Sequence, residues 1–301
     1  MDSSDELKEF LRASRAKLRP SDVGLPRVAL HGAASARRVP GLRREEVAQL
    51  AGVSVDYYAR LEQGRTRQVS DAVLSSVADV LRLNPTEREY LFALVSLQAQ
   101  PLSRRTAGSA AERVRPSVRR TLAAFTTSPA LVMGRGMRVL AMNSLARAVF
   151  FDLGVVPRRE RNMARWTFLA PEARDLYDEW ETIAAEAAAV LRADAGAHPD
   201  DQALNELVGE LTVKSADFRR LWADHDVYRC GFGTIRLTHP VAGPLSVDYE
   251  ALDVPGAADQ KIVVYMAPEG SRSEDALAML ASWTAEPLAA EPVTAPDTTA
   301  R

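Results

Sequence analysis

The residues best suited to chemistry in this chain are the cationic and polar side chains of region 43–67, which can hydrogen-bond to phosphates and to base edges. Apolar residues recur at helical spacing over 44–51, Gly52 fits the left-handed position that ends a helix, and Ser54 is placed to cap the next helix. The small residue Ala48 stands where two steeply crossing helices must approach closely. The spacing predicts a helix-turn-helix pair that reads DNA. An ordinary helical hairpin with solvated charges is the weaker alternative.

The side chains left outside this hairpin form a mixture of short, amphipathic and cationic groups suited to a DNA groove. We expect Arg60 on the second helix to read a base, and Arg43, Arg44 and Arg65 to contact phosphates. The basic loop 20–42 is expected to follow the phosphate backbone, although a plain spacer is the alternative reading. The predicted DNA-binding residues are Arg37, Arg38, Arg43, Arg44, Ser54, Val55, Asp56, Tyr57, Arg60, Gln63, Arg65 and Arg67.

The distribution of charge supports this prediction, although the net charge of the chain is only −2. Residues 8–67 hold 13 Lys and Arg against 6 Asp and Glu, whereas residues 121–301 hold 17 against 26. Cations therefore surround the predicted hairpin, where neutralisation of phosphates requires them, and an acidic body follows.

The composition argues against several other classes of protein. The single cysteine, Cys230, cannot form an internal disulfide, and no apolar run approaches a membrane span or a signal peptide, so we expect a cytoplasmic, nucleoid-associated protein. No Ser/His/Asp set, metal-ligand set or Gly-rich phosphate loop stands at a usable spacing, and His225 with His239 lacks a third ligand. The sequence predicts no enzyme activity, no metal and no cofactor.

The chain of 301 residues, 47% of them apolar, is long enough for two domains. The predicted boundaries are a DNA-binding domain of five helices over 1–98, a linker over 99–116, a second domain over 117–285, and a disordered tail over 286–301. In the second domain we expect strands at 130–133, 139–142, 234–239, 245–252 and 261–267, and helical sections at 143–151, 171–191 and 202–222. The predicted fold is an α+β domain with a five-stranded antiparallel sheet and helices on one face.

A cavity between such a sheet and its helices is a natural ligand site. All four tryptophans of the chain fall in the second domain, together with most of its other aromatic residues. Aromatic side chains are more often simply core, and the polar candidates can equally be turn residues or satisfied core partners. The predicted ligand-binding residues are Met142, Asn143, Trp166, Phe168, Trp180, Trp222, His225, His239 and Tyr249.

Several runs of the sequence together resemble the MmyB-like transcription regulators over nearly the whole chain. These runs are 38–65, 161–166, 198–201, 218–222, 239–240 and 248–252. The resemblance implies an XRE-type, lambdoid-repressor-like helix-turn-helix domain followed by a PAS-like ligand-binding domain of the MltR/MmyB type. By similarity to phage repressors, the base-reading positions are Val55, Asp56 and Arg60. Those repressors often place Gln where Val55 and Asp56 stand, so their base code does not transfer.

The expected partners follow from the two predicted domains. A single helix-turn-helix covers few base pairs, so we expect a homodimer on an inverted repeat in double-stranded DNA. The second domain is expected to bind an apolar or amphipathic effector, for example a fatty acyl chain, that modulates DNA binding. Two alternatives remain: a second domain that serves only as a scaffold for dimerisation or protein contacts, and an enzyme fused to a helix-turn-helix.

Overall fold

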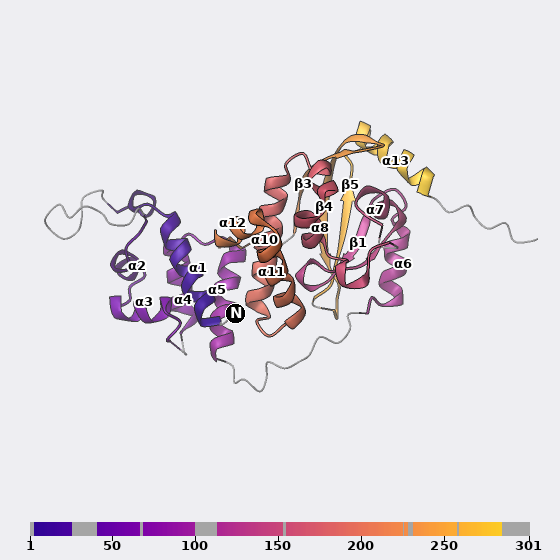
Figure 1. The fold of residues 1–301 in the computed structure, drawn as a ribbon. Helices are drawn as coiled ribbons and strands as arrows, with labels where there is room; N and C mark the ends of the chain where they lie inside the picture. The colour runs from indigo at the N-terminus through magenta and orange to yellow at the C-terminus, as the bar shows by residue number, and fades with distance from the viewer. Residues whose placement is uncertain are drawn as a thin grey trace, which may run out of the picture.

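The computed structural model of the chain describes residues 3–25, 41–66, 69–99, 113–152, 155–224, 226–227, 231–257 and 259–284. Residues 3–99 form a helical domain, and residues 113–284 form a sheet domain (Figure 1). Three helices lie between the helical domain and the sheet, namely α10 (Trp180–Ala197), α11 (Gln202–Lys214) and α12 (Ala216–Ala223).

The described residues of the helical domain form the five α-helices that the sequence predicts and one short 3-10 helix. Its core is built from apolar side chains that recur at helical spacing, so that Phe10, Tyr58 and Leu94 are all buried. The Phe10 ring meets the Tyr90 ring edge to face, with 5.1 Å between centroids. The elements are α1 (Ser3–Lys17), η1 (Pro20–Val23), α2 (Arg44–Leu50), α3 (Val55–Glu62), α4 (Asp71–Val80) and α5 (Pro85–Ala99).

The sheet domain is built on five antiparallel strands in the order β2-β1-β5-β4-β3, which confirms the predicted sheet. Residues 134–138 connect the first two strands through a 3-10 turn, η3 (Arg135–Met137). Alternation of buried and exposed side chains along β3 shows that one of its faces meets the core and the other meets solvent. The strands are β1 (Ala130–Met133), β2 (Val139–Met142), β3 (Phe232–His239), β4 (Gly243–Asp253) and β5 (Lys261–Met266).

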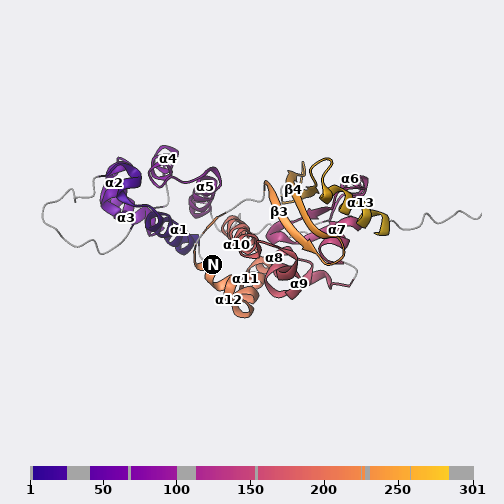
Figure 2. The same ribbon diagram turned by 90° about the horizontal axis from the view of Figure 1, so that it is seen from above.

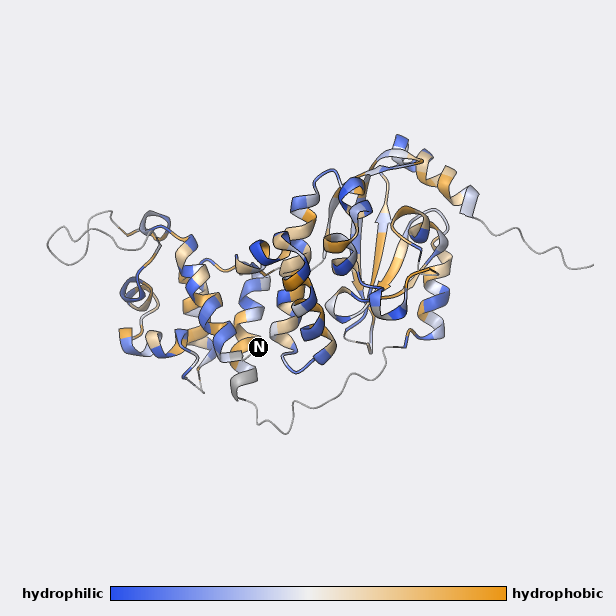
Figure 3. Ribbon diagram, in the orientation of Figure 1, coloured by the Kyte–Doolittle hydropathy of each residue, from blue (hydrophilic) through white to orange (hydrophobic). Residues whose placement is uncertain are grey.

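Helices cover both faces of this sheet, so the prediction of helices on one face only is wrong. On the main face, Leu131, Val263 and Tyr265 pack against several helices, and this cluster is the largest apolar core of the domain. Figure 3 shows the central strands coloured largely as hydrophobic. On the opposite face, Val118 and Leu122 of α6 (Pro116–Ala124) cover alternate residues of β1 and β5. This core takes residues from α10 and from four further helices, namely α7 (Ser144–Val149), α8 (Met163–Leu169), α9 (Pro171–Leu176) and α13 (Arg272–Thr284). A short 3-10 turn, η4 (Arg158–Glu160), precedes α8.

Three of these helices, α6, α8 and α13, have no counterpart in the sequence prediction. Each buries only two apolar residues, namely Val118 and Leu122 in α6, Met163 and Ala164 in α8, and Leu277 and Leu280 in α13. The predicted section 171–191 is also divided, because α9 ends at Leu176 and α10 begins at Trp180. Short helices of this kind depend on the surface on which they pack more than on their own propensity.

The two domains meet along α5 and α10. Ala193 of α10 and the buried Val227 belong to the same apolar cluster as the core of the helical domain. The helices α2 and α3 lie at the far end of the helical domain, away from the sheet, in two perpendicular views (Figures 1 and 2). The predicted DNA-reading helix is therefore not covered by the sheet domain.

Candidate DNA-reading surface and ligand pocket

The turn between α2 and α3 has the geometry that the sequence predicts. Gly52 is left-handed, with φ of 69°, and the backbone N–H of Val53 donates to the carbonyl of Ala48 at 3.0 Å. Ser54 caps α3 because its Oγ accepts the N–H of Tyr57 at 3.1 Å. Ala48 and Leu61 are fully buried at the crossing of the two helices. The hairpin is therefore fixed by its own backbone bonds and by the core of the helical domain.

The outer face of α3 presents the predicted base-reading positions to solvent. Val55 is 46% exposed, Tyr57 is half-buried, and the side chains of Asp56 and Arg60 are exposed. Arg60 forms an ion pair with Asp56 at 3.0 Å, one helical turn away. An exposed pair of this kind contributes little to stability, so Arg60 can exchange Asp56 for a hydrogen-bond acceptor on a base edge at small cost.

Arg44 has a structural partner, which distinguishes it from the other predicted phosphate contacts. Its guanidinium donates to Glu62, which is almost fully buried at 1% exposure, with N···O distances of 3.0 and 2.9 Å. Arg15 of α1 reaches the same carboxylate at 3.3 Å and also donates to the carbonyl of Leu42 at 2.6 Å. Hydrogen bonding to Glu62 raises the pKa of Arg44 above its ordinary value. Arg44 therefore ties α2 to α3, while about half of its side chain remains exposed.

The remaining predicted DNA contacts lie on either side of this hairpin. Arg65 is exposed, Gln63 is half-buried in the turn after α3, and Arg43 is half-buried at the N-terminus of α2. The backbone N–H of Arg43 donates to Glu46 at 2.6 Å, so its side chain is not needed for this cap. Residues Arg37, Arg38 and Arg67, and most of the predicted basic loop, lie outside the described residues.

An apolar pocket of about 70 Å³ lies in the sheet domain between the main face of the sheet and α10. Glu186 is the single ionisable carboxylate in its wall, and burial raises the pKa of this carboxyl above its ordinary value. Flexible methionine side chains make such a wall adaptable. The lining residues are Met133, Met137, Met163, Thr167, Tyr177, Ile183, Glu186, Ala187, Val190, Ile235, Tyr249 and Tyr265.

Of the nine predicted ligand residues, Tyr249 lines this pocket. The aromatic residues Trp166, Phe168 and Trp180 pack beside it in the surrounding core, and Met142 is partly buried against the same core. Trp222 lies farther away, where it stacks on Phe218. His225 lies outside the described residues.

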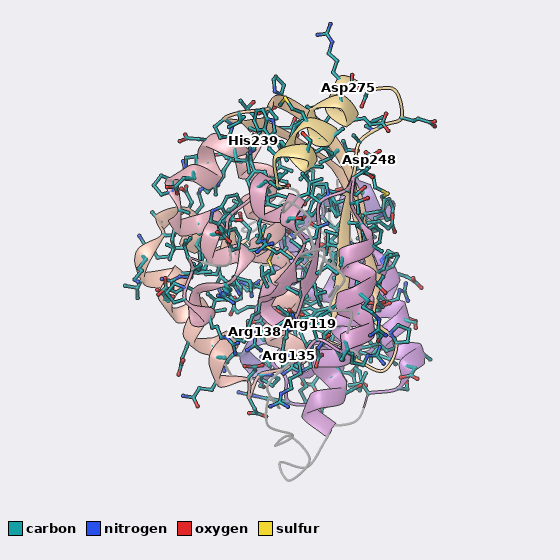
Figure 4. The ribbon with its side chains drawn as sticks, turned by 90° about the vertical axis from the view of Figure 1, so that its right-hand side faces the viewer. Arg119, Arg135, Arg138, His239, Asp248 and Asp275 are labelled. Carbon is teal, nitrogen blue, oxygen red and sulfur yellow. The ribbon has the colours of Figure 1, made fainter. Side chains whose placement is uncertain are left out.

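Two of the four predicted polar ligand groups, Asn143 and His239, are occupied by backbone partners. The Asn143 amide donates to the carbonyls of Phe125 and Ser128 at 2.8 Å each, and its oxygen accepts the N–H of Ala130 and Ala146. His239 bonds the carbonyl of Ala148 and accepts two backbone N–H groups of the turn after β3. Both side chains hold local backbone in place. Figure 4 labels His239 at the end of the molecule opposite to Arg135.

A larger cleft of about 670 Å³ adjoins the pocket, because Met133, Met137 and Val190 line both. One wall of the cleft comes from α5 of the helical domain, through Tyr90 and Ala93 among others. The other walls come from α10 and from the ends of β1, β4 and β5. A volume of this size is typical of sites for small molecules.

Charged groups surround the rim of the cleft. Arg135 donates to Asp201 at 2.8 Å and to Asp259 at 2.6 Å, and Lys261 forms an ion pair with Asp253 at 2.8 Å. Burial and the nearby cation Arg135 lower the pKa of His198 below its ordinary value. The cations of the rim are therefore already paired with carboxylates of the same domain.

Sequence reasoning missed Glu186 and the methionines of the pocket. Glu186 stands in an alanine-rich helical section, where a charged residue normally indicates a solvated face. The available signal was its position one turn before Val190, on the same side of α10 as Ile183. Methionine is common in any core, so Met133 and Met137 gave no sequence signal of a pocket.

Two further features, a metal centre and a membrane-spanning helix, are absent from the described residues. No group of three or more His, Cys, Asp and Glu side chains there is arranged to hold a metal ion. No helix in the described ranges has the length and apolar character that crossing a membrane requires.

Comparison with known families gives two matches that correspond to the two domains. Residues 114–280, more than half of the chain, match the model of the MmyB-like transcription regulator ligand binding domain. Residues 6–91 match a helix-turn-helix domain model. No curated protein matches the chain. The hairpin geometry of α2 and α3, the five-stranded sheet and these two matches agree, and the chain belongs to the MmyB-like transcription regulators.

Proposed function

We propose that this DNA-binding transcription regulator responds to an apolar or amphipathic small molecule, for example one with a fatty acyl chain, held by its sheet domain, and that it acts without enzymatic chemistry. The observation that carries this proposal is the apolar pocket beside a cleft that the helical domain borders. A molecule in that position lies next to the domain that carries the helix-turn-helix. Its binding can shift DNA affinity if it prefers one arrangement of the two domains over the other.

On the DNA side, we propose that Arg60 reads a base while Arg43 and Arg65 contact phosphates. The support is the exposure of Arg60 and Arg65 on or beside α3, and the position of the half-buried Arg43 at the start of α2. Both helices lie at the end of the molecule remote from the sheet (Figure 2). Arg44 can reach a phosphate with its exposed half while its other half holds Glu62. Useful specificity requires two copies, so we propose a homodimer on an inverted repeat with half-sites about one helical turn apart.

The experiment that tests the effector half begins with native mass spectrometry of the purified chain, which detects a molecule that co-purifies with it. Bound material is then removed, and decanoate, decanol and decylamine are titrated while tryptophan fluorescence and DNA affinity are followed together. We expect at least one of these probes to change both signals. If none changes either signal and no molecule co-purifies, the second domain is a scaffold rather than a sensor.

The DNA half is tested by a gel shift on fragments from upstream of the coding sequence, with the mass of the complex measured by sedimentation. We expect two chains per site. Binding by one chain alone would contradict the proposed homodimer without affecting the effector half of the proposal.

A further inference from the structure

The pocket in the sheet domain is too small to hold an effector by itself. Its volume of about 70 Å³ is less than half of the roughly 150 Å³ of an apolar cavity that holds benzene. An acyl chain that enters it must therefore continue into the adjoining cleft, whose volume is about 670 Å³. Because α5 forms one wall of that cleft, the ligand then touches the helical domain directly.

The contact between α5 and α10 beside the cleft is built from buried polar groups. The Arg192 guanidinium, 1% exposed, donates to the carboxylate of Glu6 in α1 at 2.6 Å, and the hydroxyl of Tyr90 donates to the same oxygen at 2.8 Å. Arg192 also donates to the carbonyl of Trp222 and lies 4.1 Å over its indole ring. We call this set of four residues the interdomain cluster.

The helices α5 and α10 also approach closely at Gly196. A Cβ atom at this position would lie 2.2 Å from the Tyr90 ring, so only glycine allows the Tyr90 side chain to rest there. Tyr90 therefore has two roles in this arrangement, because it lines the cleft and it bonds Glu6. A ligand that displaces Tyr90 from the wall also disturbs the interdomain cluster.

One helix connects the pocket to this cluster. Glu186, Ala187 and Val190 of α10 line the pocket, while Arg192 and Gly196, one to two turns later, meet the helical domain. Since α10 is a rigid element, a shift of its pocket-lining side moves Arg192 against Glu6.

The charges that surround the site indicate which head group it accepts. The cleft is lined by four carboxylates, those of Glu89, Asp194, Asp253 and Asp259, against the two cations Arg135 and Lys261. Arg135 pairs with Asp259 and Lys261 pairs with Asp253, so the lining keeps two carboxylates in excess, one of which, Asp194, accepts the N–H of Gly136. Glu186 adds a half-buried carboxylate to the apolar pocket. An anionic head would meet more acidic groups than basic ones, whereas an alcohol, amide or amine can donate hydrogen bonds to them.

We propose that the effector site is shared by the two domains, with the apolar end of the effector in the pocket, a hydrogen-bond-donating head in the cleft, and α5 as a wall. The proposal rests on the proposed function, because it assumes that the sheet domain binds an effector. An effector in this shared site changes the stability of the bonds within the interdomain cluster, and it thereby changes the position of the helix-turn-helix relative to the sheet domain.

A tethered alkyl chain tests the shared site without requiring knowledge of the natural effector. In a Cys230→Ser background, Ala93→Cys places a thiol on the α5 wall of the cleft, and Ser96→Cys places one on an exposed position of the same helix outside it. Both variants are treated with hexyl methanethiosulfonate. We expect the hexyl group attached at residue 93 to change DNA affinity at least fivefold, a typical size for coupling between sites. The hexyl group attached at residue 96 should change DNA affinity less than twofold. Equal effects at the two positions would overturn the proposal.

The head group is tested by the same three ten-carbon probes on the unmodified chain. We expect decanol and decylamine to bind at least tenfold more tightly than decanoate. A hexyl group attached at residue 93 should block the binding of both decanol and decylamine. Tighter binding of decanoate would overturn the assigned head group. If no probe binds, the proposed ligand class fails, but the tether at residue 93 still decides whether α5 borders a site coupled to DNA binding.

Discussion

Two buried carboxylates, Glu62 and Glu6, have similar surroundings and different consequences. Each is almost fully buried and each meets an arginine, but Glu62 bonds Arg15 and Arg44 of its own domain, whereas Glu6 bonds Arg192 of the other domain. If Glu62 loses its charge, two arginines are left without their partner inside one folded unit. If Glu6 loses its charge, the domains can separate and Arg192 can return to water. Glu62 therefore supports a fold, and Glu6 supports an arrangement of two folds.

The largest expected effect is that of Glu62→Gln on the helical domain. Glu62→Gln leaves the largely buried Arg15 without its carboxylate, whereas the half-exposed Arg44 can turn to water. We therefore expect the free energy of unfolding of this domain to fall by about 3 kcal/mol, the low end of the range for breaking a buried ion pair. Urea denaturation followed by circular dichroism at 222 nm measures it. The control is Glu45→Gln on the exposed side of α2, which should cost less than about 1 kcal/mol. Equal losses for the two variants would contradict the role assigned to Glu62.

Glu6→Gln should have a smaller effect on stability and a larger one on the arrangement of the domains. The loss of a charged hydrogen-bond partner costs about 1–3 kcal/mol, and separation of the domains relieves part of that cost. We expect a larger radius of gyration in small-angle scattering and faster hydrogen exchange in α1 and α10. Glu9→Gln, one turn later on α1, changes a carboxylate in surface ion pairs and serves as the control. A compact Glu6→Gln chain of unchanged scattering would show that the interdomain cluster does not hold the domains together.

This contrast also indicates what the sequence can predict. The hairpin and all five strands were predicted because each depends on local spacing, as Gly52, Ser54 and the run at 130–133 illustrate. Glu62 lies only 18 residues from Arg44, yet its burial depends on α1 as well. Glu6 and Arg192 are 186 residues apart, and nothing in either neighbourhood indicates the other. For the same reason the sequence does not indicate which side chains line the pocket, since aromatic content indicates a core and not the empty space within it.

A third carboxylate, Asp56, extends the comparison to the molecular surface. Its ion pair with Arg60 is exposed, so breaking it costs little, and Arg60→Ala should leave the free energy of unfolding unchanged to within about 0.5 kcal/mol. If Arg60 reads a base, the same variant should weaken binding to cognate DNA by about 1–3 kcal/mol.

The control for Arg60→Ala is Arg65→Ala. If Arg65 contacts a phosphate, this variant should weaken binding to cognate and to random DNA equally. It should also reduce by about one unit the slope of log affinity against log salt concentration. Fluorescence anisotropy at several salt concentrations measures both variants. An Arg60→Ala chain that keeps its full preference for cognate DNA would refute the assignment of Arg60 to base reading.

The sharpest test of the interface comes from two glycines in neighbouring helices, where only a small gain in stability is expected. Gly209→Ala in α11 adds a Cβ atom with no neighbour within 4 Å, so the chain should gain about 0.5–1 kcal/mol from helix propensity alone. Gly196→Ala brings the same intrinsic gain to α10, but its Cβ would meet the Tyr90 ring at 2.2 Å. The added Cβ atom fits only if α5 moves away from α10. We therefore expect Gly196→Ala to retain its helix content and to show a larger radius of gyration in small-angle scattering, as is expected for Glu6→Gln. If Gly196→Ala behaves as Gly209→Ala does, with a compact chain and a small gain in stability, then the close approach of α5 and α10 is not what holds the two domains together.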